Sequence, residues 1–552
     1  MASKMLVALG IPDFKTYILK YFLPVFLLDA LFLFVFLLIF PGFVFQVVGF
    51  TIFVIVLISL FAYPMMIVDK KTKDIEENIH YFITYAGALS TVNLERKEFF
   101  QDLSNKERYP EIASLFKKLL YLVETIKVDF STASYKTAGL INSEPFARFF
   151  ERMGIALSFN AEISKFFLEE QKAIMNSYET IYRESLERIK MFQELFLSLI
   201  LSYAFVLSTA LLIPFLIGAS PEIYLQYGVL ALFVIDLMML VFATSFLPRD
   251  PLYHSMGYEK GRLRSLFLFF ALSVVCVVIA PFVLMTDWTY MVKFAAIATP
   301  LLIVGMYANY HEKLVKKRDI LFPAFIRSLG NVHQSKGGTL TSTVETLLPH
   351  DFGILNDMLT RVYKRLKITS DKFSSWYYFS KESGSALIAE FMDIFVTVVY
   401  RGGSSQIAGE IVSDNFARIN GLRDQKQEYI STLKGSIYGT YLGLGITIYI
   451  SLLISMMLFN IFTDLTEDMT GMALDLVEGV FPVGLEADFS YFSVLVAGML
   501  SVHAFFSAYL IKLVDGGNKF SMFTDFVILM WIGAFMDFGV TAAFENLFPN
   551  FF

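Results

Sequence analysis

Three basic side chains in the polar stretch RVYKRLK are spaced to act together. Arg361, Lys364 and Arg365 follow i, i+3, i+4 spacing, which places them on one face of a helix. They lie more than 40 residues from the nearest apolar segment, so anchoring of a membrane helix does not explain them. Such a face suits the acidic surface of a partner protein. Residues 309–435 carry 17 Lys and Arg against 13 Asp and Glu, too small an excess to indicate nucleic acid.

A second basic cluster follows directly after an apolar segment and consists of Lys313, Lys316, Lys317 and Arg318. Lys and Arg at the ends of membrane helices hold the orientation of the chain and contact anionic lipid. That explanation covers Lys316 and Lys317 well. The cluster also stands at the start of the polar block that carries Arg361, so it is a secondary candidate for partner binding. Both interpretations stay open.

Four acidic residues fall inside apolar segments, namely Asp29, Asp236, Asp525 and Asp537. An acid near the centre of a bilayer costs about 2.5–3.5 kcal/mol, so each needs a buried partner or a role. One interpretation is a path for protons or ions. The other is a set of hydrogen-bonded acids that hold helices together. No Lys or Arg accompanies them at depth, which favours the second interpretation.

The sequence carries no motif of an enzyme. It has no G-x-x-x-x-G-K-[ST] loop for binding nucleotide phosphates, no H-E-x-x-H and no G-x-S-x-G. None of the six His is spaced with another His or Cys as metal ligands are. The single Cys276 excludes a disulfide within the chain. We therefore expect no catalytic residue, no cofactor and no metal.

The elements that position these residues are membrane helices, because 56% of the 552 residues are hydrophobic and 59 are Phe. Crossing a bilayer takes about 20 apolar residues. Nine stretches qualify: 23–40, 43–68, 195–217, 228–247, 266–285, 289–308, 437–461, 490–512 and 523–545. The polar regions between them follow helical periodicity. The sequence therefore predicts an all-α, polytopic membrane protein.

Basic residues predict the orientation of these nine helices. With the N-terminus in the cytoplasm, 44 of the 45 Lys and Arg lie in cytoplasmic segments or at their edge, and Lys293 is the exception. The outer loops then have no Lys or Arg, and the largest, 462–489, carries seven acids. Nine crossings place the C-terminus outside the cell.

The chain also repeats itself. Each half has two membrane helices, a cytoplasmic island of roughly 125 residues and two more helices. PFARFFERM (145–153) and LIAEFMDIF (387–395) share apolar spacing 242 residues apart. We expect one-sided apolar stripes at Phe146, Phe149, Phe150 and Met153 and at Leu355, Met358, Leu359 and Val362. The predicted domains are 1–68 with two membrane helices, the first island 69–194, four membrane helices in 195–308, the second island 309–436, and three membrane helices in 437–552.

A duplicated helical cytoplasmic domain between apolar helices, without an ATPase motif, resembles the membrane platform proteins of type II secretion and type IV pilus machines. NSEPFARFFERM (142–153) and ESGSALIAEFMDIF (382–395) carry the resemblance. The glycine–acid pair of bacterial members is matched only loosely by SGSALIAE (383–390). The nine-helix form with an outer C-terminus is similar to the archaeal members that serve the archaellum, the archaeal flagellum.

The resemblance implies a non-enzymatic hub in the cell membrane. A hexameric secretion-type ATPase would dock on the islands, and archaellin or pilin subunits would gather at the membrane helices, with a homo-oligomer, most simply a dimer, as the assembly. The ATPase and the platform would drive filament assembly and rotation. Two alternatives stay open, namely the platform of a non-rotating archaeal adhesive pilus and, in another class, an ion-coupled membrane transporter. Nucleic acid is not an expected partner.

Overall fold

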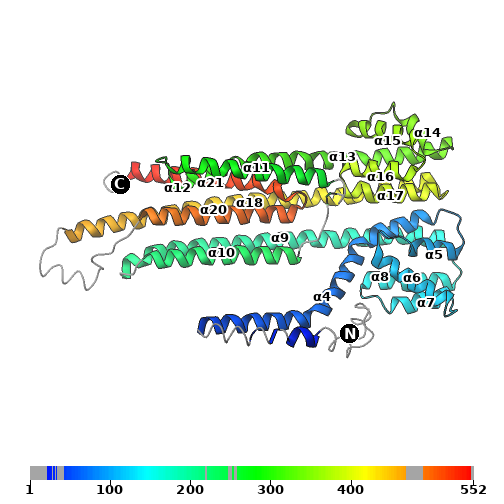
Figure 1. Cartoon of the computed structure of the whole chain (residues 1–552), viewed down its shortest axis with the longest axis horizontal. Coiled ribbons are helices and arrows are strands. Elements are labelled where there is room, and N and C mark those ends of the chain that lie inside the picture. Colours follow the sequence, from blue (N-terminus) through cyan, green and yellow to red (C-terminus); the bar gives the residue numbers. More distant parts are fainter. Residues whose placement is uncertain are drawn as a thin grey trace. The chain divides into compact units, whose positions relative to one another are not determined.

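The computed structural model describes residues 22–27, 29–30, 33, 43–217, 221–246, 252–253, 258–467 and 489–548. These residues are helical almost throughout (Figure 1), and the part of the chain described contains no strand, only an isolated bridge between Tyr253 and Ser385. The all-α prediction is confirmed. The described residues of Met1–Tyr178, Gly330–Gly337 and Ile394–Val412 form one compact unit, and those of Glu179–Leu329, Gly338–Asp393 and Ser413–Phe552 form a second.

Six described helices are long and apolar enough to cross a membrane, and a bent pair makes a seventh candidate. The six are α9 (Ile163–Ile217), α10 (Pro221–Phe246), α11 (Tyr258–Leu284), α18 (Ser405–Glu467), α20 (Phe489–Asp515) and α21 (Met522–Leu547). The bent pair is α12 (Tyr290–Ala298) and α13 (Leu301–Lys336). These coincide with seven of the nine predicted spans. Most of the first predicted span, 23–40, lies outside the described residues.

The second predicted span, 43–68, lies in α4 (Phe43–Leu89). The structure describes this part of the chain as a helix but describes few of its side chains. The count of nine therefore stays a prediction. Helices α4, α9, α13 and α18 each run without a break across a predicted domain boundary. Those boundaries also stay predictions.

The bend of 47° between α12 and α13 falls at Thr299 and Pro300. Proline has no N–H to donate to the preceding turn and its ring clashes there, so a helix breaks at this residue. The Nε1–H of Trp531 on α21 donates to Thr299 Oγ1 at 3.1 Å. A few residues on, a Cβ at Gly305 would lie 2.4 Å from the backbone N of Thr524, so only glycine permits this approach of α13 to α21.

Helices α9 and α18 pair side by side between residues 187–211 and 429–455, in register with the internal repeat. Polar contacts join Glu187 to Tyr429, Gln193 to Ser436, Ser208 to Ser451 and Leu211 to Ser455, at separations of 242, 243, 243 and 244 residues. The two sequence segments that indicated the repeat are also 242 residues apart. These residues therefore lie within two positions of their repeat equivalents, which is the geometry of a pseudo-two-fold axis running between two parallel helices.

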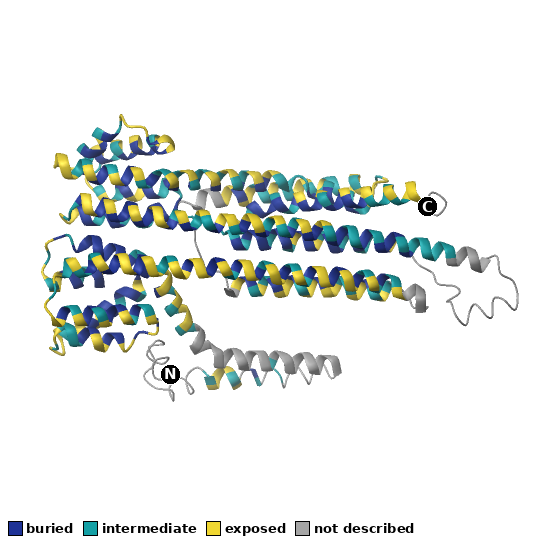
Figure 2. Ribbon diagram, turned by 180° about the vertical axis from the view of Figure 1, so that it is seen from behind, coloured by how far each residue is buried: buried dark blue, intermediate teal, exposed yellow. Residues whose placement is uncertain are grey.

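Helices α10 and α20 show the same relation. Gln226 contacts Tyr491 and Asp236 contacts His503, at separations of 265 and 267 residues. The separation is larger because the connection from α18 to α20 is longer than the one from α9 to α10. Tyr203 on α9 donates to Gly228 O on α10 at 2.9 Å and contacts Met499 on α20. The four helices thus form one bundle about a pseudo-two-fold axis, with buried inner faces and exposed outer faces (Figure 2).

The polar regions fold as short helices with aromatic cores. In the first compact unit, α5 (Arg96–Ser104), α6 (Pro110–Glu124), α7 (Phe130–Ala138) and α8 (Glu144–Ser158) accompany the end of α4. Phe116 packs against Phe82, Phe100 and Phe150 at centroid distances of 5.1–6.2 Å. The predicted stripe of Phe146, Phe149, Phe150 and Met153 is buried, as expected.

The second unit contains α14 (Leu340–Leu347), the 3-10 turn η2 (Gly353–Leu355), α15 (Asn356–Ile368) and α16 (Lys372–Ser383), and α17 (Ala386–Tyr400) begins in it. The predicted stripe of Leu355, Met358, Leu359 and Val362 is buried, so this prediction is also confirmed. Gly337 and Gly338 have φ of 66° and 86° and follow the end of α13 in the left-handed conformation.

The in-register pairing of α9 and α18 is testable by cross-linking. Ser208 and Ser451 have Oγ atoms 2.6 Å apart, so Ser208→Cys with Ser451→Cys, in a Cys276→Ala background, should form a disulfide on mild oxidation in membranes. A protease site placed at Gly337–Gly338 then gives two fragments that stay joined on a non-reducing gel. In the control, Val206→Cys with Ser451→Cys, the fragments should separate, because Val206 is exposed. Cross-linking of the control alone would contradict the register.

Candidate docking surface and intramembrane polar sites

Helices α15 and α16 form a hairpin that presents the predicted basic face. Asp371 starts α16 by accepting from the N–H of Phe373 at 3.0 Å and that of Ser374 at 3.3 Å. Gly384, with φ of 70°, ends it in the left-handed conformation. The apolar stripe of α15 is buried, so its basic residues face outward.

Arg361 and Arg365 are brought together by a carboxylate on the facing helix. Glu382 of α16 accepts from Arg361 Nε at 2.8 Å and from Arg365 Nη2. The guanidinium of Arg365 also lies 5.4 Å from the ring centroid of Tyr378. Partial burial raises the pKa of Glu382, but the hydrogen bonds from Arg365 and Arg361 outweigh it, so the pKa lies below its usual value. These two Arg side chains are therefore held in fixed positions.

Lys364, the third predicted residue, is exposed and makes no hydrogen bond or ion pair with the described residues. Its ammonium group is the part of the face most available to a partner. The spacing argument placed the three cations on one face correctly. It missed Glu382, because the turn between α15 and α16 that brings residue 382 back to residue 361 leaves no periodic signal.

The secondary cluster on α13 divides into exposed and bonded residues. Lys313 and Lys317 are exposed. Arg318 donates to Ser383 O at 2.8 Å and so fixes the end of α16 on α13. Lys316 donates to Gln427 Oε1 at 2.8 Å and lies 3.7 Å from Asp515 Oδ1.

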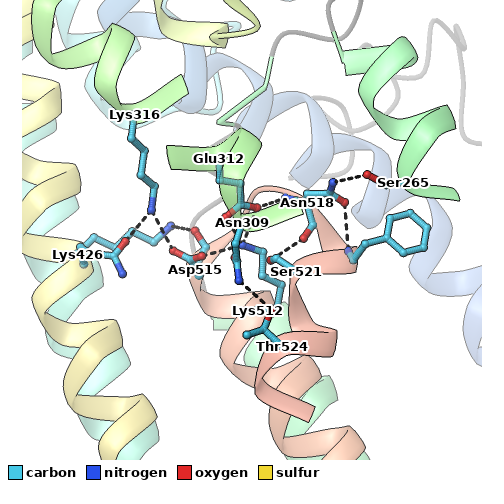
Figure 3. A network of polar contacts seen from close by, with 12 residues as sticks. Ser265, Asn309, Glu312, Lys316, Lys426, Lys512, Asp515, Asn518, Ser521 and Thr524 are labelled. Carbon is cyan, nitrogen blue, oxygen red and sulfur yellow. Dashed lines mark hydrogen bonds and ion pairs between the residues drawn. The ribbon is translucent and has the colours of Figure 1, made fainter. Parts of the chain in front are cut away.

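Behind Lys316 lies a buried polar network where α13 meets the end of α20 (Figure 3). Lys512 Nζ contacts Glu312 Oε1 at 2.8 Å and Asp515 Oδ2 at 2.8 Å. Glu312 also accepts from the backbone N–H of Asn518 at 2.6 Å. A cavity of about 90 Å³ opens beside the network and is lined by Lys316, Asp319, Arg423, Asp424, Lys426 and Asp515, in which cations and carboxylates balance. Mutual neutralisation makes this a structural junction between helices.

Asp236 has a buried partner within the membrane bundle. Its carboxylate lies 2.9 Å from Nδ1 of His503, and both side chains are almost completely buried. Phe196 and Tyr441 stack on the imidazole ring at centroid distances of 6.4 and 6.0 Å. Nε2 of His503 is buried without a hydrogen-bond partner in the described structure, so Nδ1 is the ring nitrogen that pairs with the carboxylate. The arrangement joins α10 to α20.

Asp525 is also partnered. It pairs with Lys434 and accepts from the hydroxyl of Tyr438 at 2.7 Å, both on α18. Asp29 and Asp537 are buried, without a Lys or Arg partner in the described structure. The search of the sequence for Lys and Arg partners did not include His503. This residue lies mid-way along its predicted span, as Asp236 does along its own. Among the residues described, no group of three or more His, Cys, Asp or Glu is placed to hold a metal ion.

Comparison with known proteins shows the family to which the chain belongs. The chain is 33% identical to flagella accessory protein J of Methanocaldococcus jannaschii over 493 residues, which covers 87% of each chain. It is 28% identical to flagella accessory protein J of Methanococcus voltae over 532 residues, or 94% of each. The chain belongs to the flagella accessory protein J family. No family model and no solved structure matches it.

The sequence match to these relatives extends over both compact units. The platform resemblance seen in the sequence is therefore confirmed at the level of the family. The roles of the individual residues on α15 and α13 stay predictions, as do those of the intramembrane acids.

Loss of one partner of the Asp236–His503 pair should destabilise the bundle. Asp236→Leu leaves the buried Nδ1–H of His503 unpaired, at a cost of about 1–2 kcal/mol. Asp236→Asn keeps an acceptor and should change stability by less than about 0.5 kcal/mol, and Asp236→Leu with His503→Leu should recover most of the loss. Thermal unfolding in detergent measures this cycle. Loss of filament assembly in Asp236→Asn cells with normal protein levels would instead show an ion-coupled role.

The Glu382 ion pairs should make stability depend on pH. Because folding lowers the pKa of Glu382, its contribution is fully present above the ordinary glutamate pKa of 4.5 and is lost as pH falls through the lower folded pKa. Partial exposure limits this to less than about 1 kcal/mol. Melting of the wild type and Glu382→Gln should differ at pH 7, and the difference should shrink as the pH falls below the ordinary glutamate pKa. The exposed Glu410→Gln serves as control, and a difference that grows in acid would contradict the assignment.

Proposed function

We propose that this protein is the membrane platform of an archaeal type IV pilus-like machine, the archaellum. It would anchor the filament and couple a cytoplasmic hexameric ATPase to filament assembly and rotation. The main support for the proposal is that the chain matches two relatives over nearly its whole length. Both relatives are named flagella accessory protein J. That shared name favours the archaellum over an adhesive pilus.

The paired intramembrane acids favour a platform over an ion-coupled transporter. Asp236 and Asp525 are satisfied by His503 and Lys434, each from another helix. Side chains that pair within the bundle join helices, whereas a transport site needs groups that converge on an ion or a substrate. The repeats also cross the membrane in the same sense according to the predicted topology, unlike the inverted repeats of many transporters.

The ATPase would dock on the islands, with the α15 face as its principal contact. In this assignment Lys364 supplies an exposed charge that is not paired in the described structure. Arg361 and Arg365 supply charges that Glu382 holds in place. Lys313 and Lys317 add exposed charge on α13, and Lys316 and Arg318 mainly hold neighbouring elements in place. Filament subunits and anionic lipid would contact the apolar outer faces of the membrane helices, and the platform would assemble as a homo-oligomer, most simply a dimer.

Charge reversal tests the dock. Lys364→Glu should weaken binding of the purified ATPase to the nanodisc-embedded protein about three- to tenfold, and Arg361→Glu with Lys364→Glu and Arg365→Glu by about tenfold or more. Both should flatten the dependence of affinity on salt, because opposite charges no longer meet. Lys172→Glu, which reverses an exposed charge on α9, is the matched control. Equal affinity and equal salt dependence for all variants would refute this face as the dock.

A further inference from the structure

The α15–α16 hairpin packs on α13 through the start of α15 and the last turns of α16. Arg318 of α13 donates to Ser383 O at the end of α16, and a Cβ at Gly353, before α15, would lie 3.1 Å from Leu321 of α13. The ring of Phe379 packs 5.9 Å from Phe325. These contacts hold the start of α15 and the last turns of α16 against α13.

Apolar side chains are exposed at the turn between α15 and α16 and along the outer face of α16. The exposed fractions are 86% for Ile368, 50% for Phe373 and 42% for Tyr377. The same helix buries Trp376 and Phe379 almost completely. Phe373 and Tyr377 are four residues apart and share one helix face, so α16 carries one apolar face inward and a second one outward. The outward face, together with Ile368, is called the aromatic tip below.

Cations surround the aromatic tip. Residues 356–383 hold six Lys and Arg against three Asp and Glu, a net charge of +3. Lys364 and Lys367 are exposed on α15, one turn or less before Ile368. Arg365 lies against Tyr378, which neighbours Tyr377 with ring centroids 5.7 Å apart. An aromatic centre with a charged rim is the usual composition of a protein-binding surface, in which Tyr and Arg supply most of the binding energy.

We propose that Ile368, Phe373 and Tyr377 form the apolar centre of the ATPase dock and enter a hydrophobic socket with an acidic rim on the ATPase. The inference rests on the proposed function and specifies the chemistry of the partner. Charge complementarity selects an acidic partner, because the hairpin is basic. Glu382 and Tyr378 hold two of its cations in place, which suits a fixed set of carboxylates better than a fluid lipid surface.

In this arrangement the two kinds of contact affect binding differently. The cations at the rim increase the rate of encounter and make it depend on salt. Burial of the aromatic tip slows dissociation and is insensitive to salt, since it removes apolar surface from water. The two contributions can thus be separated in one experiment.

The test is ATPase binding to the full chain in nanodiscs across a salt series, with Phe373→Ala and Tyr377→Ala combined. Affinity should fall about ten- to hundredfold through faster dissociation, with the salt dependence unchanged. Both side chains lie on the outer face, so folding should persist, and an unaltered melting temperature checks this. Phe159→Ala, at an exposed aromatic residue of the first unit, is the matched control and should bind as the wild type does.

The outcomes separate this inference from the proposed function. If Lys364→Glu weakens binding and the aromatic variant does not, the dock stands and the aromatic tip is refuted as its centre. If neither variant changes binding, the dock itself is refuted. Equal losses in Phe159→Ala would also overturn the assignment to the tip. Binding to phosphatidylglycerol vesicles is measured by flotation for the same variants. If the aromatic variant loses vesicle binding but keeps ATPase binding, the aromatic tip is a lipid contact and the proposal is refuted.

Discussion

Polar groups inside a bilayer need a partner from the protein, and the bundle of α9, α10, α18 and α20 depends on this constraint. The hydrocarbon gives helices no hydrophobic reason to associate, so hydrogen bonds and close packing of small residues hold them. Ser208 meets Ser451, and Ser455 reaches the backbone O of Leu211, all within predicted membrane spans. Because the two halves repeat in parallel, these contacts join residues at or next to equivalent positions of the repeat.

Duplication within one chain allows equivalent positions to differ. In a symmetric dimer of half-chains, an acid beside the axis would face the same acid, and one of the two would have to be protonated. Here Asp236 faces His503, which can donate to it, and Glu187 faces the hydroxyl of Tyr429. In the fused repeat, facing positions therefore carry complementary groups. Two identical half-chains related by symmetry could not provide such pairs.

Much of this fold could be predicted from the sequence, because its main determinants are local. Bilayer thickness sets the length of an apolar span, and seven predicted spans coincide with helices. Helical periodicity identified both buried stripes. The partners could not be predicted, since they lie far apart in the sequence. His503 is 267 residues from Asp236, and Glu382 reaches Arg361 only because a turn reverses the chain. The repeat distance was visible in the sequence, but the contact between equivalent residues was not.

Contacts along α13 connect the proposed docking face to the membrane helices within the second compact unit. The hairpin of α15 and α16 rests on α13 through Arg318 and Phe325. From there α13 continues without a break to Gly305, where its backbone lies against Thr524 of α21 too closely for any side chain. An α-helix is stiff along its axis, and the close contact at Gly305 holds α13 against α21. Force applied at the hairpin would therefore move α21 together with α13, and the buried network of Lys512, Glu312 and Asp515 would carry the same displacement to α20.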